Sequence, residues 1–339
     1  MNSPLTVAIV GATGAVGQEF LNLFESRDFP VGDLRLLASA RSAGKTAMFR
    51  GKEYAIQEAL PSAFEGVDVA FFSAGATRSR DLVPAALEAG ALVVDNSSAF
   101  RMRPDVPLTV PEINLDDTPK GAKLVAVPNC SAILLLMAVH PLRSLGKIER
   151  LIVSTYQSAS GGGAAVMEEL RESTRAYLEG RDYEPRAVQH PYAFNLFSHN
   201  TAIGPTGANE EETKVVEESR KILGMPELKV NVTCVRVPVL RAHSESVTIE
   251  FDGPAPSEEE ARVVLAGAPG VKVVDERDLN LFPMPAHASG QGDVLVGRIR
   301  QDPSNPNGLC LFLAGDQLLK GAALNAVQIA EALIERDGI

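Results

Sequence analysis

Cys130 is the residue whose surroundings most suggest chemistry. It stands in the segment VPNCSA, between the apolar stretch LVAV and the apolar run ILLLMAV. These patterns predict a strand that ends just before the cysteine and a helix that begins at it. A helix N-terminus favours an anion and lowers the pKa of a thiol from about 8.5 toward about 7. Although most free cysteines are small buried residues, this placement predicts a nucleophile at the sheet edge where α/β folds bind ligands.

The neighbours of Cys130 have interpretations of their own. Asn129 carries an amide, a group that holds a developing oxyanion in other enzymes. Ser131 has a side chain suited to capping the helix. The other cysteines, Cys234 and Cys310, lie in strand patterns, and we expect them to be buried structural residues.

A thiol nucleophile needs a base, and His243 is the candidate for that role. It lies in RVPVLRAHSES after a predicted strand, with Arg236 and Arg241 close by in the sequence. His140 falls in the apolar helix after Cys130, where packing is the favoured role. Three further histidines lie in loop-like segments and stay open as candidates: His190, His199 and His287.

The segment GATGAVG places three glycines between a predicted strand and a predicted helix. Such a turn lets a phosphate approach backbone N–H groups at a helix N-terminus. The spacing is GxxGxxG rather than the common GxGxxG, so the position of the turn carries the prediction. We expect a dinucleotide to contact Gly11, Thr13, Gly14, Ala15 and Val16.

The second predicted strand ends in LASARSAGK, at the point where NAD enzymes usually carry an acid for the ribose 2′-hydroxyl. No acid stands there. Arg41 and Ser42 are instead available to bind a 2′-phosphate, with Lys45 nearby. The missing acid and the added arginine favour NADP over NAD.

Strands and helices alternate in the first part of the chain, which predicts βαβ units around a buried parallel sheet. A strand, a turn and a helix occupy residues 5–29. A further helix is predicted at 78–90, and further strands are predicted at 33–39, 68–75, 91–97 and 123–129. The fold class of this part is therefore α/β.

After about residue 130 the pattern changes to an α+β domain with a mixed or antiparallel sheet. Helices are predicted at 164–180 and 257–268, and the stretch 180–210 reads as an irregular excursion. Residues 318–337 form an amphipathic helix that we expect to pack back on the first domain. The strands of this part are predicted at 150–160, 230–239, 244–253, 293–302 and 308–316.

Composition narrows the function classes. The chain of 339 residues is long enough for two domains, with 45% hydrophobic and 22% charged residues. Its net charge of -11 argues against a nucleic-acid partner or an anionic membrane. The longest strongly apolar run is far shorter than the roughly 20 residues of a membrane helix.

The cysteines and the N-terminus point to a cytoplasmic protein. Three cysteines do not form a disulfide framework, and a reducing cytoplasm is their simplest location. The N-terminus lacks the pattern of a signal peptide. The histidines and cysteines show no metal-ligand spacing, so we expect no metal.

Seven segments of the chain occur in an order that resembles a known family. They are VAIVGATGAVGQEF, ASARSAGK, DNSSAFRM, VPNCSAI, YQSASGGG, NEEETK and VRVPVLRAHSES. Together they closely resemble aspartate-β-semialdehyde dehydrogenases of the bacterial type over essentially the whole chain, with PNCS and RVPVLRAHS as the specific signatures. The resemblance implies a Rossmann-like NADP-binding domain (1–129 and 318–339) and an α+β catalytic and dimerisation domain with a mixed sheet (130–317).

The resemblance also implies a reaction. NADPH reduces aspartyl β-phosphate to aspartate semialdehyde and phosphate, on the route to lysine, threonine, methionine and diaminopimelate. A thioacyl group forms on Cys130, with His243 as acid/base. The family forms dimers or tetramers, so we expect at least a homodimer.

Binding roles follow from the same resemblance. Arg101 and Lys214 are expected to hold phosphate, Arg236 the substrate α-carboxylate, and Glu211 the α-ammonium. Gln157 orients the thioacyl group, and Asn129 lies beside Cys130. Contacts near the nicotinamide are expected from Ser160, Gly161 and Gln317.

Two departures from the family pattern affect these roles. Position 317 is Gln where many relatives carry Asn. The run NEEET offers Glu210 and Glu212 beside Glu211, and only the spacing to Lys214 favours Glu211.

Three alternatives stay open. N-acetyl-γ-glutamyl-phosphate reductase shares the turn, the thiol and the histidine, but an acetylated amine has no charge for Glu211 to pair. Glyceraldehyde-3-phosphate dehydrogenase would call for an acid after the second strand, because it prefers NAD. A non-catalytic NADP-binding regulator has no need of Cys130, His243, Arg101 and Arg236 together.

Overall fold

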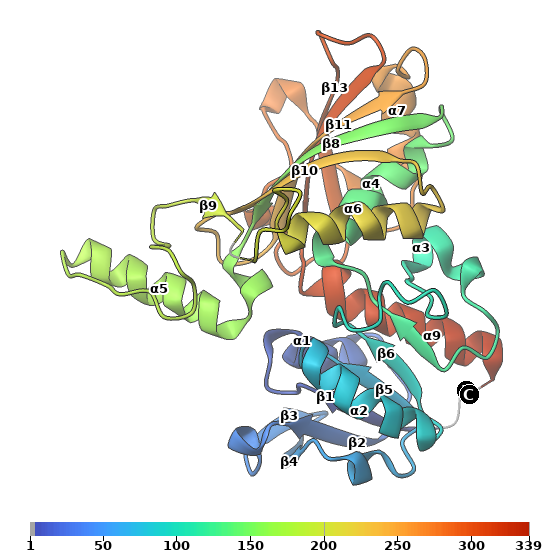
Figure 1. Ribbon diagram of the computed structural model, residues 1–339, viewed down its shortest axis with the longest axis vertical. Helices are drawn as coiled ribbons and strands as arrows, with labels where there is room; N and C mark the ends of the chain where they lie inside the picture. Colours follow the sequence, from blue (N-terminus) through green and yellow to red (C-terminus); the bar gives the residue numbers. More distant parts are fainter. Residues whose placement is uncertain (1–3, 200, 339) are drawn as a thin grey trace. The chain divides into compact units, whose positions relative to one another are not determined.

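The computed structural model describes residues 4–199 and 201–338, and the chain divides into two compact units (Figure 1). The first unit comprises Met1–Asn129 with Ala322–Ile339, and the second comprises Cys130–Gly321. The chain therefore leaves the first unit at the residue before the candidate thiol and returns to it near its C-terminus.

A mostly parallel sheet forms the centre of the first unit. Its strand order is β3-β4-β2-β1-β5-β6-β7, and each neighbouring pair is parallel except β3 with β4. Every residue of β5 and β6 is buried, which explains why these strands read as unbroken apolar runs. The strands are β1 (Leu5–Val10), β2 (Val31–Ala38), β3 (Thr46–Phe49), β4 (Lys52–Glu58), β5 (Val69–Phe72), β6 (Leu92–Asp95) and β7 (Leu124–Ala126).

The helices of the first unit come from both ends of the chain. The C-terminal helix α9 packs against α1, α3 and β6, and Arg27 and Glu331 form a bidentate pair at 2.9 and 2.6 Å. The helices are α1 (Ala15–Ser26), α2 (Ala76–Glu88), α3 (Pro111–Asn114) and α9 (Leu324–Asp337), with short 3-10 helices η1 (Ala40–Ser42), η2 (Pro61–Phe64) and η3 (Leu115–Asp117).

Four phenylalanines pack α1 onto this sheet. Phe20 and Phe24 lie one turn apart on the buried face of α1. Together with Phe29 and Phe71 they form a cluster whose contacting rings have centroids between 4.8 and 6.0 Å apart. This contact fixes the helix that follows the glycine turn, and therefore the direction of its N-terminus.

The hairpin of β3 and β4 was not predicted from the sequence. Its two-residue turn is formed by Arg50 and Gly51, with φ of 48° and 72°. Two successive positive φ angles are typical of hairpin turns, for which Asn-Gly is the usual signal. An arginine in the first position hides that signal.

The second unit contains a mixed sheet, as predicted. Its order is β12-β13-β14-β11-β8-β10-β9. The pairs β8–β10 and β12–β13 are parallel, and the others are antiparallel. The strands are β8 (Ile148–Gln157), β9 (Phe197–Ser198), β10 (Lys229–Arg236), β11 (His243–Phe251), β12 (Val271–Val273), β13 (Val294–Gln301) and β14 (Gly308–Gly315).

Three helices of the second unit, α4, α6 and α7, pack on this sheet and on one another (Figure 1). Helix α4 is buried almost throughout, which explains its apolar sequence on all sides. The helices are α4 (Cys130–Leu142), α5 (Ala164–Leu178), α6 (Glu210–Leu223), α7 (Glu258–Ala266) and α8 (Pro285–Ala288), with 3-10 helices η4 (Ala159–Gly162) and η5 (Arg277–Leu279) and the π-helix η6 (Leu319–Ala323).

Helix α6 was not among the predicted helices. Asn209 and Glu212 form a capping box at its N-terminus, a pattern that is visible in NEEE. Between α5 and α6, the described residues form irregular chain apart from the short β9, in agreement with the predicted excursion at 180–210.

Within residues 4–199 and 201–338, none of the helices combines the length and the apolar character needed to cross a membrane.

Candidate active site

Four strands of the second unit end at one edge of its sheet. Gln157 ends β8 and Arg236 ends the parallel strand β10, where the two residues are register partners. His243 begins the antiparallel strand β11 and pairs with Gly315, the last residue of β14. Residues that lie far apart in the sequence therefore meet at one position, where the topology requires these strand ends to coincide.

The orientation of His243 is fixed by Ser158. The backbone N–H of Ser158 donates to Nδ1 of His243 at 3.1 Å, and the Ser158 hydroxyl lies 3.0 Å from the same nitrogen. Because Nδ1 accepts, the proton of the neutral imidazole lies on Nε2. Burial, followed by the charge of Arg236, lowers the pKa of His243 to about 3, so the ring is neutral at physiological pH.

Arg236 is buried beside this histidine. Its Nη1 donates to the carbonyl of Ser158 at 2.6 Å, and its Nη2 lies 2.7 Å from Nε2 of His199. Among the described residues, Nε of Arg236 and Nε2 of His243 have no hydrogen-bond partner. Two buried N–H donors that lack an acceptor are suited to an anionic or carbonyl ligand.

Gly161 leaves open the space beside Nε2 of His243. A Cβ atom at this position would lie 2.9 Å from Nε2 of His243 and 3.1 Å from Nη1 of Arg236. A side chain at position 161 would therefore crowd the unpartnered Nε2 of His243 and the guanidinium of Arg236.

A second set of contacts holds the backbone before His243. Ala242 has a φ of 71°, a conformation that costs about 1–2 kcal/mol for a residue with a Cβ. Its N–H donates to Oε1 of Gln317 at 3.0 Å, and Arg241 forms an ion pair with the buried Asp316 at 2.6 Å. The residues that follow β14 therefore hold the histidine in place.

These contacts bear on two predicted nicotinamide contacts. The amide of Gln317 is engaged within the second unit, because its Nε2 donates to Oγ of Ser160 while its Oε1 accepts from Ala242. Ser160 is buried and its hydroxyl also lies 2.9 Å from that of Ser158. Both side chains thus support the His243 position.

The three glutamates of α6 have different environments. Glu212 belongs to the capping box and accepts from the N–H of Cys234 at 3.0 Å, and Glu210 is exposed. Glu211 is buried, and its Oε1 accepts from Nε2 of Gln157 at 3.2 Å. The geometry therefore favours Glu211 as the carboxylate that faces the strand-end site.

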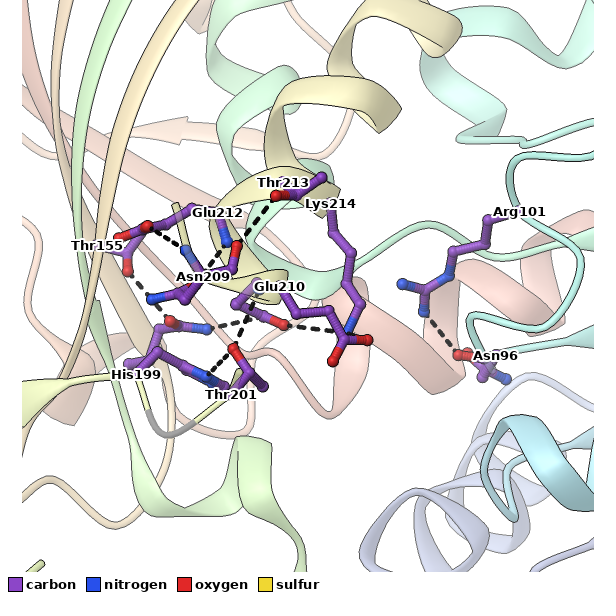
Figure 2. A network of polar contacts seen from close by, with 12 residues as sticks. Asn96, Arg101, Thr155, His199, Thr201, Asn209, Glu210, Glu212, Thr213 and Lys214 are labelled. Carbon is purple, nitrogen blue, oxygen red and sulfur yellow. Dashed lines mark hydrogen bonds and ion pairs between the residues drawn. The ribbon is translucent and has the colours of Figure 1, made fainter. Parts of the chain in front are cut away.

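Lys214 lies one turn further along α6. Its Nζ is 3.1 Å from Oε1 of Glu210 and 3.7 Å from Oε2 of Glu211. Figure 2 shows the lysine extended beside Glu210, with Asn209 and Glu212 at the helix N-terminus. The ammonium group is thus held on the side of the helix that carries Glu211.

Cys130 is the first residue of α4 and is half-buried. Gly321 packs against it, because an added Cβ there would lie 2.9 Å from Cβ of Cys130. The preceding residue, Asn129, is buried. Cys234 and Cys310 are free and buried, as predicted.

The predicted capping role of Ser131 is wrong. The helix begins at Cys130, so Ser131 is its second residue, and the cap position falls on Asn129.

Arg101 is buried in the first unit. It donates from Nε to the carbonyl of Val127 at 2.8 Å and from Nη2 to that of Asn96 at 2.8 Å, and Figure 2 shows it beside Asn96. Val127 lies three residues before Cys130, so the guanidinium is tied to the segment that leads to the thiol.

A cavity of about 460 Å³ lies at the C-terminal edge of the first sheet. Gly11, Thr13, Gly14 and Arg41, four of the residues that the sequence predicts to contact a dinucleotide, line it. Ala15, Val16 and Ser42 are not among the lining residues, which are Val10, Gly11, Thr13, Gly14, Ala38, Ser39, Arg41, Glu58, Ala59, Ser73, Ala74 and Arg78. Ala15 and Val16 begin α1, whose N-terminus faces the turn.

The glycines of this turn are required by close packing. Gly11 has a φ of 96°, and a Cβ there would lie 2.4 Å from the carbonyl oxygen of Ser73. A Cβ on Gly17 would lie 2.3 Å from the carbonyl oxygen of Gly11. The backbone of the turn can therefore approach a phosphate closely.

Several residues of these sites were missed. Arg78 and Glu58 line the cofactor cavity, and the position of Arg78 at the start of a helix after a strand would have suggested it. His199 was one of the three loop histidines left open as candidates, but no pattern indicated its contact with Arg236. The packing of Gly321 against Cys130 could not be predicted, because the glycine lies in an apolar helical sequence.

No group of three or more His, Cys, Asp or Glu side chains that could hold a metal ion occurs in the part of the chain that the structure describes.

Comparison with known proteins finds two matching family models. The family model "Semialdehyde dehydrogenase, NAD binding domain" matches residues 6–120, and "Semialdehyde dehydrogenase, dimerisation domain" matches 139–320. Aspartate-semialdehyde dehydrogenase of Synechocystis sp. is 54% identical over 336 residues, which cover 99% of each chain.

Solved structures give the same result. The crystal structure of aspartate semialdehyde dehydrogenase II from Vibrio cholerae, complexed with ASA, has a TM-score of 0.95 and 41% identity, and the match covers 99% of this chain and 100% of that one. The enzyme from Candida albicans with NADP has a TM-score of 0.77 and 26% identity over 99% of both chains.

Proposed function

Because the chain belongs to the aspartate-semialdehyde dehydrogenase family, an NADP-dependent phosphorylating oxidoreductase of amino-acid biosynthesis, we propose that Cys130 is its acyl-carrying nucleophile. Two features support this role. Cys130 is the half-buried cysteine of the three, and it opens a helix. The helix N-terminus stabilises the thiolate that attacks the acyl phosphate.

The reaction begins with this thiolate and regenerates it. In the reductive direction the sulfur attacks the carbonyl carbon, a C–S bond forms, and the C–O bond to phosphate breaks with its electron pair on the departing phosphate. A thioester results, which accepts hydride where a carboxylate would not. Bound NADPH supplies that hydride to the carbonyl carbon. The C–S bond then breaks, the carbonyl re-forms, and aldehyde leaves while the thiolate is regenerated.

His243 acts in this sequence as a hydrogen-bond donor. Its Nε2–H, fixed by the bond from Ser158 to Nδ1, stabilises negative charge on the carbonyl oxygen in both steps. A ring that is protonated on Nε2 can donate a proton, which is the acid part of the predicted acid/base role. Asn129 and Gln157 orient the same group.

Four charged residues have proposed roles in substrate binding. Arg236 pairs with the α-carboxylate through its unpartnered Nε, and Glu211 pairs with the α-ammonium. Lys214 and Arg101 bind phosphate. The free ammonium explains why a buried carboxylate at position 211 suits the free amino acid and not an N-acetylated one.

The first unit fits NADP. The glycine turn leaves no room for a Cβ at Gly11, and Arg41 lines the cavity. Arg41 would hold the 2′-phosphate with Ser42, and the turn from Gly11 to Val16 would hold the pyrophosphate. The contacts near the nicotinamide are proposed to come from Ser160, Gly161 and Gln317.

We also propose a homodimer, with a homotetramer as its possible further assembly, because the second unit matches a dimerisation domain. The substrate is a small molecule, and neither nucleic acid nor a membrane is a proposed partner. A cytoplasmic location keeps the thiol of Cys130 reduced.

The observation that carries the proposal is the meeting of Gln157, Arg236 and His243 at one sheet edge with two unpartnered donors. The test is to mix the protein with NADP, phosphate and aspartate semialdehyde and to follow the NADPH absorbance. We expect turnover that Cys130→Ala abolishes and that the control Cys310→Ala retains. Absence of turnover in the unaltered protein overturns the activity, and unchanged turnover in Cys130→Ala overturns the mechanism.

A further inference from the structure

His199 contacts the arginine that we assign to the substrate carboxylate. Nη2 of Arg236 lies 2.7 Å from Nε2 of His199. A guanidinium carries donors only, so Nε2 of His199 is the acceptor and bears no proton. The proton of the neutral ring is then on Nδ1, which lies 3.3 Å from Oγ1 of Thr201.

The same threonine contacts the helix that carries Glu211. The backbone N–H of Glu211 donates to Oγ1 of Thr201 at 3.2 Å, so this oxygen accepts from both His199 and Glu211. Figure 2 shows the His199 ring beside Thr201, below the N-terminus of α6. A continuous chain of hydrogen bonds therefore runs from Arg236 through His199 and Thr201 to Glu211.

Further contacts hold the two ends of this chain in place. The backbone N–H of His199 donates to the carbonyl of Cys234 at 2.9 Å, which attaches the irregular segment to β10. The side chain of Glu211 accepts from Gln157. Arg236 and Glu211 come from different elements, and His199 with Thr201 connects them by hydrogen bonds.

We propose that His199 is a positioning residue that holds Arg236 and, through Thr201, sets the distance between the carboxylate-binding and ammonium-binding groups of the substrate site. The inference rests on the proposed function, because it assumes that Arg236 and Glu211 recognise an α-amino acid. It gives His199 an indirect part in recognising the α-carboxylate and α-ammonium groups of the substrate. The histidine itself does not touch the reacting carbon.

The neighbours of His199 keep it neutral. It faces Arg236 from β10, His243 from β11, and Glu211, Glu212 and Lys214 from α6. Burial lowers its pKa to about 4, with Glu211 and Glu212 acting against burial and Arg236 and Lys214 adding to it. The acceptor at Nε2 is therefore preserved throughout the physiological pH range.

Two substitutions test the role. His199→Phe keeps a ring but removes the acceptor, whereas His199→Gln keeps an acceptor oxygen and a donor nitrogen at a similar spacing. A matched control is His190→Phe, which alters an exposed histidine of the same segment that packs on Phe197. Each variant is assayed with aspartate semialdehyde, phosphate and NADP.

We expect His199→Phe to raise KM for aspartate semialdehyde about tenfold or more, because a bond to a charged group is lost. KM for NADP should stay unchanged, His199→Gln should recover most of the loss, and His190→Phe should match the unaltered protein. An unchanged KM for aspartate semialdehyde in His199→Phe, or equal increases for all substrates, overturns the proposal.

The tautomer of the His199 ring can be measured in the unaltered protein, without an assay of turnover and without a variant. A nitrogen-proton correlation spectrum of the unaltered protein should show His199 as the Nδ1–H tautomer. The Nε2–H tautomer overturns the inference and leaves the dehydrogenase assignment intact. Conversely, absence of any turnover removes the proposed function while the tautomer can still be read.

Discussion

The backbone N–H of Ser158 and Nδ1 of His243 form a hydrogen bond of 3.1 Å, and this bond decides what the histidine can do. A backbone N–H only donates, so Nδ1 accepts and the ring proton is on Nε2. Protonation of Nδ1 would break this bond and place a second charge beside Arg236. The fold therefore maintains a neutral ring that points a donor at the ligand space kept open by Gly161.

The depressed pKa of His243 predicts a pH dependence of stability. In the unfolded chain a histidine titrates near 6.5, and in the folded protein the pKa is about 3. Between these values the unfolded state binds more protons, so the stability present above about pH 6.5 is lost as the pH falls toward 3. Urea unfolding at pH 6.5, 5.5 and 4.5 should show a loss of up to about 1.4 kcal/mol per pH unit that is absent in His243→Asn. Parallel pH curves for the two proteins contradict the prediction.

Gly161→Ala should close the space in front of Arg236 and His243. The new methyl would lie 2.9 Å from Nε2 of His243, a distance that forces either the ring or the loop to move. We expect kcat/KM for aspartate semialdehyde to fall about 100-fold or more, since misplacement near 1 Å costs about that much. Gly267→Ala is the control, because an added Cβ there would lie 3.7 Å from the carbonyl oxygens of Val263 and Val264, an ordinary contact distance. Equal activity of both variants argues against the assigned ligand space.

Arg41→Ala should weaken NADP binding selectively. A charge-assisted bond to a phosphate contributes about 1.5–3 kcal/mol, so KM for NADP should rise at least about tenfold, while kcat/KM with NAD stays within a factor of about two. The control Arg171→Ala alters an exposed arginine of α5 that pairs with Glu168. Equal losses with both cofactors would show that Arg41 does not read the 2′-phosphate.

Sequence patterns predicted the parts of the fold that depend on local periodicity. The parallel strands, the start of α4 at Cys130 and the C-terminal helix follow from apolar runs and turn residues. The motifs also placed Cys130, His243 and the glycine turn. The hairpin at Arg50 and Gly51 and helix α6 were missed, because an unusual turn residue and a run of like charges concealed them.

The contacts that position the site depend on long-range pairing and were not visible in the sequence. Ser158 and His243 are 85 positions apart, and Ala242 and Gln317 are 75 apart. No local pattern reports which tautomer results or that Gln317 supports the His243 backbone. The role proposed for His199 depends on its contacts with Arg236 and Thr201, which its irregular segment does not indicate.

Glu245 lies two residues after His243 on the same face of β11, opposite Thr155 and Leu313 in the register. The side chain is fully buried, and neither carboxyl oxygen has a hydrogen-bond partner among the described residues. Burial raises the pKa of this carboxyl well above its usual value, so the fold favours its neutral form.

The raised pKa of Glu245 predicts that stability depends on pH in the direction opposite to that expected from His243. Because the folded pKa is raised, the stability from this group is fully present below about pH 4.5 and is lost as the pH rises toward the folded pKa. Glu245→Gln is nearly isosteric and cannot ionise in the unfolded chain. It should equal the unaltered protein near pH 4 and exceed its free energy of unfolding increasingly above that, by up to about 1.4 kcal/mol per pH unit. Urea unfolding of both proteins at pH 4.5, 6 and 7.5 measures the difference, and a constant difference across this range would mean that Glu245 is ionised in the fold and paired.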